Sequence, residues 1–227
     1  MLQSMDEYKD IASDIRQIYK LLDGYFGNLY WWPADTPFEV VVGAILTQNT
    51  AWRNVVTAIL KLKDANILAP ESLYRVELST LATLIRSSGY YRVKAIRLKA
   101  FVDFLYEEHG GSLEALFAGG VWQIREKLLH INGIGEETAD SILLYAGQKQ
   151  VFVVDAYTKR ILMRHGIVNE RAGYKDIQSM FMDSLPQSVP LYNQYHALLV
   201  NTAKHFCTKK SRCGECPLKD ITASALL

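Results

Sequence analysis

The chain has 227 residues, of which 49% are hydrophobic, so it is long enough to bury a substantial core. Its 25 lysines and arginines nearly balance 24 aspartates and glutamates, and a net charge of +1 excludes nucleic-acid binding through bulk positive charge alone. No apolar run reaches the roughly 18–20 residues that cross a bilayer, and the N-terminal segment lacks the apolar stretch of a signal peptide. We therefore expect a cytoplasmic protein without a membrane partner.

Apolar residues recur at helical spacing along most of the chain, and residues 38–47 are apolar on nearly every face. The run 150–154 is strand-like but short, so we interpret it as an extended connector. The sequence therefore predicts an all-α fold, with helices over 7–23, 38–47, 53–63, 71–76, 79–86, 91–107, 112–117, 121–128, 136–147, 155–165, 174–183 and 189–205.

Residues 129–139 join two of these helices through the tight turn Gly133-Ile134-Gly135. Glycine permits a positive φ or the close approach of another backbone. Because a helix begins directly after the turn, its first N–H groups are available to bind a phosphate oxygen without a basic side chain. The pattern is short, and an ordinary connection between two helices is the alternative.

Four motifs, in family order, resemble those of the endonuclease III family of DNA glycosylases. Residues 131–139 resemble the hairpin L-P-G-V-G-x-K-T-A, and residues 153–157 resemble the V-D-T-H segment that carries the catalytic aspartate. Residues 46–50 resemble the L-S-x-Q-x-T loop, and three late cysteines resemble the iron–sulfur loop.

The resemblance implies a two-lobed helix-hairpin-helix fold with a central cleft, into which a damaged base of double-stranded DNA is flipped. We expect a nucleoid-associated monomer. Residues 36–150 would form a helical barrel that carries the wedge loops and the hairpin, and residues 1–35 with 151–227 would form the second lobe. The hairpin residues expected to contact DNA are Gly133, Gly135 and Thr138.

Asp155 opens a predicted helix, and aspartate is also a common helix cap. The resemblance implies that its carboxylate stabilises positive charge on the sugar and orients the nucleophile. Bifunctional members use a lysine at the position of Glu137, and a carboxylate cannot form an imine. We therefore predict a monofunctional glycosylase. A bifunctional enzyme acting on oxidised pyrimidines, with Lys159 or Lys204 as the amine, and a non-catalytic DNA-binding module are the alternatives.

Lys204 ends an apolar helix at a position expected to face the core. A buried lysine has a depressed pKa, so a neutral amine at this position could form a carbamate or pair with an acid. A lysine that faces phosphate is the alternative.

The residues Trp31-Trp32-Pro33 either pack in the core or hold a flipped base by stacking. Together with Glu137, they resemble the 3-methyladenine glycosylase branch of the family. Indole stacks well on an electron-poor alkylated purine. The sequence therefore predicts a base pocket for alkylated purines.

Two loops are expected to enter the DNA. The resemblance assigns Gln48, beside Asn49, to the hole left by the flipped base, and Tyr90 to a second wedge. Basic residues without an intervening acid follow from residue 86 to residue 99, and Arg92 and Lys94 are the expected phosphate contacts. A solvated helix face is the alternative.

The three cysteines are Cys207, Cys213 and Cys216, and the resemblance implies that they hold a [4Fe–4S] cluster. Thr222 stands where the family has a fourth cysteine, and the first gap has five residues instead of six. Thr222, His205 or water could complete the site, and zinc or no metal are the alternatives. The intervening loop should touch phosphates in either case, through Lys209 and Lys210.

Overall fold

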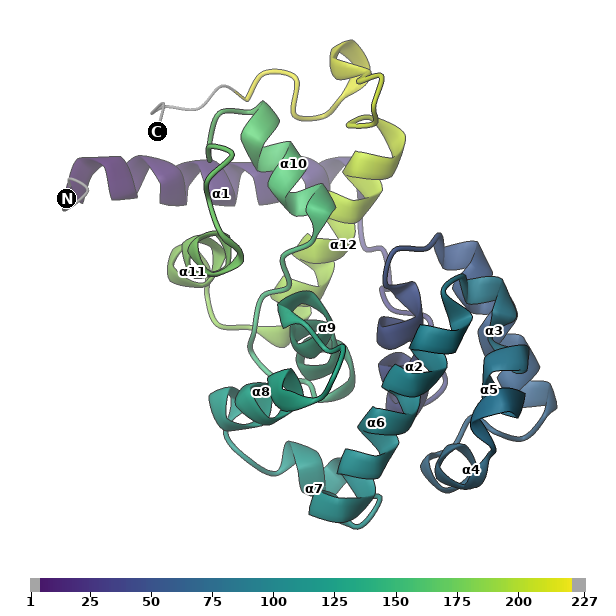
Figure 1. Cartoon of the computed structure of the whole chain (residues 1–227). Coiled ribbons are helices and arrows are strands. Elements are labelled where there is room, and N and C mark those ends of the chain that lie inside the picture. The colour runs from purple at the N-terminus through teal and green to yellow at the C-terminus, as the bar shows by residue number, and fades with distance from the viewer. Residues whose placement is uncertain (1–4, 222–227) are drawn as a thin grey trace. The chain divides into compact units, whose positions relative to one another are not determined.

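The computed structural model describes residues 5–221, with side chains from residue 11 onward, and this range is helical without strands, as the sequence predicts (Figure 1). The chain divides into two compact units. Unit 1 comprises residues 1–31 and 150–227, and unit 2 comprises residues 32–149. Among the described helices, none combines the length and the apolar character needed to span a membrane.

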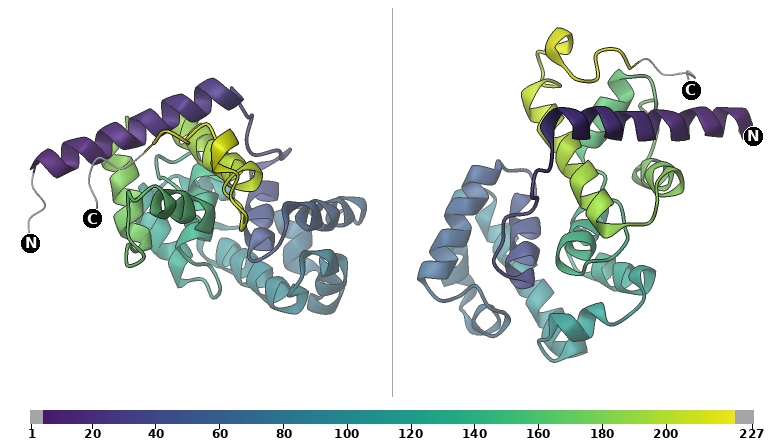
Figure 2. Two further views of the ribbon diagram at one scale, coloured as in Figure 1. Left: turned by 90° about the horizontal axis from the view of Figure 1, so that it is seen from above. Right: turned by 180° about the vertical axis from the view of Figure 1, so that it is seen from behind.

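Unit 1 is built on the long helix α1 (Met5–Phe26), which packs against α11 (Tyr174–Ser184) and α12 (Val189–His205), as Figure 2 shows. The helix α10 (Ala156–Arg164) covers α12, and the short η3 (Cys213–Glu215) follows. The buried side chains of α1 recur at helical spacing and fix the face that it turns toward α12: Ile15, Ile18 and Leu22.

Unit 2 surrounds α2 (Pro37–Thr47), whose residues are buried from Phe38 to Leu46. Thr36 caps this helix by accepting a hydrogen bond from the N–H of Glu39, and Pro37 fits its first turn. The other elements are α3 (Trp52–Asp64), α4 (Pro70–Arg75), α5 (Leu78–Leu84), η1 (Arg86–Ser88), α6 (Tyr91–His109), α7 (Leu113–Phe117), α8 (Val121–His130), α9 (Glu136–Ser141) and η2 (Ile142–Ala146).

The helix predicted over 136–147 is divided into α9 and the wider π-type segment η2. The reason is local: the N–H of Gly147 bonds to the carbonyl of Ile142, five residues earlier, where an α-helix would use the residue four earlier. Residues 150–154 form an extended connector, as expected, and Val151 to Val154 are buried.

Candidate active site

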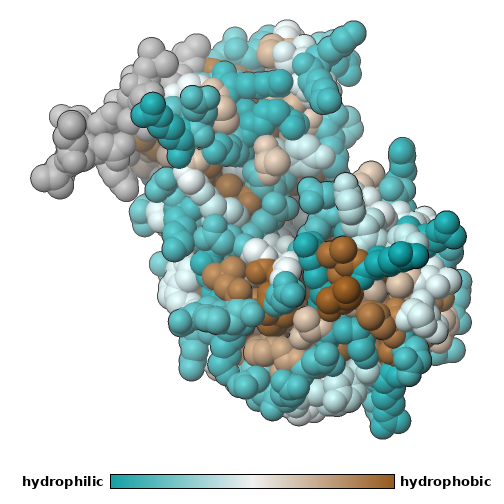
Figure 3. Space-filling model, viewed as in Figure 1, coloured by the Kyte–Doolittle hydropathy of each residue, from teal (hydrophilic) through white to brown (hydrophobic). Residues whose placement is uncertain are grey.

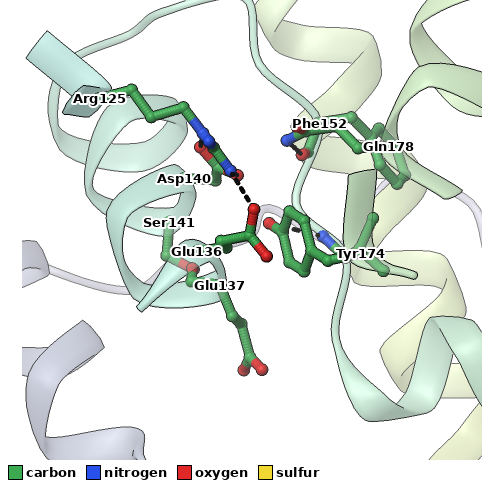
Figure 4. A network of polar contacts seen from close by, with 9 residues as sticks. Arg125, Glu136, Glu137, Asp140, Ser141, Phe152, Tyr174 and Gln178 are labelled. Atoms are coloured by element: carbon green, nitrogen blue, oxygen red, sulfur yellow. Dashed lines mark hydrogen bonds and ion pairs between the residues drawn. The ribbon is translucent and has the colours of Figure 1, made fainter. Parts of the chain in front are cut away.

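Asp155 caps α10 at the point where the connector becomes helix. Its Oδ1 accepts a hydrogen bond of 2.7 Å from the N–H of Thr158, which fixes the carboxylate on the helix start. The connector before it is held by α11: the Gln178 amide donates to the carbonyl of Phe152 at 2.6 Å, and the N–H of Val154 donates to the Tyr174 hydroxyl at 3.3 Å (Figure 4). The carboxylate therefore stands on a rigid segment.

His196 of α12 lies against this carboxylate, with its Nε2 3.7 Å from Asp155 Oδ2. Both side chains are largely buried, with 7% and 11% of their surface exposed. Burial alone would raise the pKa of Asp155, but the neighbouring imidazole of His196 and the hydrogen bonds of Thr158 outweigh it and lower this pKa. Asp155 is therefore ionised at neutral pH, as electrostatic stabilisation of a cation requires.

Sequence reasoning did not identify His196. The available signal was a histidine within the otherwise apolar run of α12, where a buried polar ring needs a partner. The sequence alone does not reveal that this partner is the carboxylate of Asp155.

The low pKa of Asp155 predicts a pH-dependent contribution to the free energy of unfolding. Because the folded-state pKa lies below the unfolded value of about 3.9, this contribution is present above about pH 4 and is lost as the pH falls through the folded-state pKa. Asp155→Asn lacks the contribution. The difference in unfolding free energy between wild type and Asp155→Asn, measured by urea unfolding, should shrink below about pH 4. A difference that stays constant with pH would contradict this assignment.

The hairpin of unit 2 has the backbone that its glycines predict. Gly133 has φ +86°, and Gly135 caps α9 in an extended conformation. Between them, Ile134 is 4% exposed and anchors the turn in the core. A buried ion pair fixes α9 to α8, because Arg125 donates to both carboxylate oxygens of Asp140 at 2.7 and 3.0 Å (Figure 4).

The two glycines of the hairpin allow a matched test of its conformation. A Cβ at Gly133 would lie 2.4–2.6 Å from Arg97 side-chain atoms, whereas nothing lies within 4 Å at Gly135. We expect Gly133→Ala to lower the free energy of unfolding by about 1–3 kcal/mol and to weaken DNA binding, because the positive φ adds strain. Gly135→Ala should change the free energy of unfolding little, because an added Cβ there meets no neighbour. Equal effects of the two substitutions in urea unfolding would show that the turn does not depend on Gly133.

Glu137 is exposed on α9, and in Figure 4 its side chain points away from the ion pair of Arg125 and Asp140. Thr138, expected to contact DNA, is 7% exposed, and its hydroxyl accepts a hydrogen bond of 2.9 Å from the Gln48 amide. Its side chain is therefore part of the packing behind the hairpin, and the predicted contact of Thr138 with DNA falls to its backbone N–H in the first turn of α9.

The predicted wedge residues stand at the ends of two loops. Tyr90 is 74% exposed and has φ +45°, and Asn49 is exposed with φ +53°. Figure 3 shows apolar side chains gathered over α6, which follows Tyr90 and leaves Val93 and Ile96 exposed. These loop ends are accessible, as an entry into DNA requires.

Burial corrects the prediction for Lys94, and hydrogen bonds describe where Gln48 lies without DNA. Lys94 is 1% exposed and donates to the carbonyls of Leu46 and Ser88, so it is not available to a phosphate. The Gln48 amide donates to the carbonyl of Gly133 at 3.0 Å as well as to Thr138, so this side chain is bonded within unit 2. Arg92 is exposed, as a phosphate contact requires.

The adjacent tryptophans belong to different units. Trp31 is half-buried in unit 1, where the Lys204 ammonium lies 5.5 Å from the centre of its ring. Trp32 is half-buried in unit 2, packs edge-on against Trp52 at 5.1 Å between centroids, and lines a pocket of about 230 Å³ with Pro33. One tryptophan therefore lines a cavity, and the other offers a face to a cation.

Lys204 is exposed, which corrects the expectation that it faces the core. Partial burial against the protein lowers its pKa, and the negative charge of Asp155 raises it. Its ammonium is thus within electrostatic range of the candidate catalytic carboxylate. Lys159, the other candidate amine, donates to the carbonyls of Glu170 and Ala172 at 3.0 and 2.6 Å. It therefore connects α10 to the segment that precedes α11 within unit 1.

The cysteine loop does not fit a four-thiolate cluster. Cys207 and Cys216 are buried while Cys213 is exposed, and the described residues contain no group of three or more side chains able to hold a metal ion. Thr222 lies outside the described residues. Lys209 and Lys210 are exposed, as their predicted contact with phosphate requires.

Comparisons with known proteins agree with these features. The profile of HhH-GPD superfamily base excision DNA repair proteins matches residues 42–187, which include the hairpin and Asp155. A provisionally assigned DNA repair glycosylase of Methanocaldococcus jannaschii is 48% identical over 211 residues, which cover 92% of this chain and 96% of the relative.

Solved structures share the fold. The 3-methyladenine DNA glycosylase of H. pylori, bound to 1,N6-ethenoadenine, aligns with a TM-score of 0.73 and 28% identity over 86% of this chain and 97% of that chain. A non-covalent endonuclease III–DNA complex aligns with a TM-score of 0.79 and 20% identity over 98% of this chain and 96% of that chain.

Proposed function

We propose that this chain releases alkylated purines from DNA without cutting the strand. The chain belongs to the HhH-GPD superfamily of base excision DNA repair proteins and is a DNA glycosylase. The observation that carries the proposal is Glu137, which stands where bifunctional relatives place a reactive lysine. A carboxylate cannot form the Schiff base that precedes strand cleavage. The remaining route to base release is hydrolysis, with water as the nucleophile and an abasic site as the product.

Asp155 supports this route electrostatically. Breaking the N-glycosidic bond leaves positive charge on the sugar, and a fixed, ionised carboxylate stabilises that charge. His196 and Thr158 hold the carboxylate in place and keep it ionised, so it needs no reorganisation during the reaction. The same carboxylate can accept a hydrogen bond from the attacking water, which aligns the water with the sugar.

Trp31 supports the choice of substrate class. The Lys204 ammonium already lies 5.5 Å from the centre of its ring, so this indole attracts a cation in the protein as it stands. A purine alkylated on a ring nitrogen is electron-poor and gains from the same electrostatic attraction. The relative from H. pylori, at 28% identity, is a 3-methyladenine glycosylase, and this similarity favours the same substrate class.

The test is base release from a panel of duplexes that carry methylated purines, 1,N6-ethenoadenine, thymine glycol or a mismatch. We expect release of 3-methyladenine, with strand nicks appearing only after alkali. Nicks on thymine glycol without alkali would overturn the proposal in favour of a bifunctional enzyme on oxidised pyrimidines. Release of a mismatched base alone would overturn the substrate class and leave the monofunctional mechanism intact.

A further inference from the structure

Two loops of unit 2 each end in an exposed residue with a left-handed backbone. Asn49 follows α2 with φ +53°, and Tyr90 precedes α6 with φ +45°. The left-handed conformation is unfavourable for tyrosine, whereas asparagine tolerates it, so the loop that ends at Tyr90 depends on surrounding contacts. Two side chains of α6, Lys94 and Arg97, bond to these loops.

Lys94 joins the bases of the two loops. Its Nζ donates to the carbonyl of Leu46 at 2.8 Å, directly before the first loop, and to the carbonyl of Ser88 at 2.6 Å, within the second. The side chain is 1% exposed, so water does not compete for these bonds. Burial and the charge of Arg97 lower the pKa of Lys94 to about 8, which still leaves it mostly charged at neutral pH and strengthens both bonds.

Arg97, one turn further along α6, extends the network to the hairpin. Its guanidinium donates to the side-chain carbonyl of Gln48, and the amide of Gln48 donates to the carbonyl of Gly133 and the hydroxyl of Thr138. Arg97 also packs against Gly133, where an added Cβ would meet it at 2.4–2.6 Å. Each polar group of the Gln48 side chain thus has a partner within unit 2.

We infer that Lys94, Arg97 and Gln48 form a polar brace that couples the phosphate-binding hairpin to the two DNA-entering loops. Gln48 is then a positioning residue, and Asn49 is the residue presented at the end of its loop. When the hairpin is bound to the DNA backbone, the brace would fix the position and angle of both loop ends relative to the bases. This inference rests on the DNA-facing role that the family resemblance implies for the loops, and it does not depend on which damaged base is removed.

The experiment measures damage discrimination without chemistry. It compares Kd for a duplex carrying a tetrahydrofuran abasic analogue with Kd for the same undamaged duplex. We expect Lys94→Met and Arg97→Met each to reduce this ratio about tenfold, because the loops lose their fixed position while the hairpin still binds phosphate. The double variant should reduce the ratio less than the product of the single effects, because both residues belong to one network.

Lys99→Met is the matched control. Lys99 lies on the same helix and also donates to backbone carbonyls, but these belong to Leu73, Tyr74 and Val76 around the α4–α5 link. It should lower stability without changing the ratio. An equal fall of the ratio in Lys99→Met would overturn the brace, since general loosening of α6 would then explain the effect. Arg97→Met keeps the test decisive if Lys94→Met fails to fold, because Arg97 is only half-buried.

Tyr90→Ala separates this inference from the role of the loops. A lower ratio in Tyr90→Ala with unchanged ratios in Lys94→Met and Arg97→Met would overturn the brace while leaving the loops on the DNA. An unchanged ratio in all three variants would overturn both the brace and the DNA-facing role of the loops. Neither result would affect the proposed preference for alkylated purines, which is measured separately by base release.

Discussion

Asp155→Asn is expected to lower the single-turnover rate of base release by about 10²–10³-fold, because the neutral amide no longer stabilises positive charge on the sugar. Asparagine is as good a helix cap as aspartate, so α10 should keep its start at the hydrogen bond to Thr158. The variant should therefore fold with α10 intact, although it lacks the pH-dependent contribution of Asp155 to stability, and the loss of base release is a loss of catalysis. It is measured by excess-enzyme kinetics on a methylated duplex, with DNA affinity determined in parallel.

Asp183→Asn is the control for Asp155→Asn, because Asp183 is an exposed aspartate of α11 in the same unit. It should release bases at the wild-type rate. If Asp155→Asn also retained the wild-type rate, its carboxylate would have no part in the chemistry. If neither the wild type nor the variant released any base from the panel while both bound DNA, the interpretation as a non-catalytic DNA-binding module would gain support.

Glu137→Lys is expected to create strand-cleaving activity. The variant places an amine where bifunctional relatives have one, and this amine should form a Schiff base with the sugar that borohydride reduces to a stable protein–DNA complex. Glu137 is exposed, and its side chain points away from the ion pair of Arg125 and Asp140, so the change should leave that ion pair intact (Figure 4). Trapping is measured as a shifted band on a denaturing gel, together with nicks formed without alkali.

Glu137→Gln separates the new amine from the loss of a negative charge, and it should give no trapped complex. Trapping of the wild type would contradict the monofunctional mechanism and would direct attention to Lys204, whose ammonium is exposed beside Trp31. Trapping of none of the three proteins would show that position 137 does not face the sugar in this chain.

The sequence by itself determined the local features of this protein. Helical periodicity located the helices to within a few residues, as the burial of Ile15, Ile18 and Leu22 along α1 illustrates, because amphipathic spacing depends only on neighbouring residues. The positive φ of Gly133 and the helix-capping position of Asp155 are local in the same sense. These features carried the family resemblance, and through it the expected fold and chemistry.

Only the tertiary structure decided which side chains meet. In the sequence, Lys94 is one of several neighbouring basic residues. In the structure its side chain is buried, and its ammonium bonds to the carbonyl of Leu46, 48 residues away. Gln48 finds its partner Thr138 at a separation of 90 residues, and His196 reaches Asp155 from another helix. Burial and hydrogen bonding depend on what the rest of the chain places beside a residue, and no local pattern encodes such a neighbour.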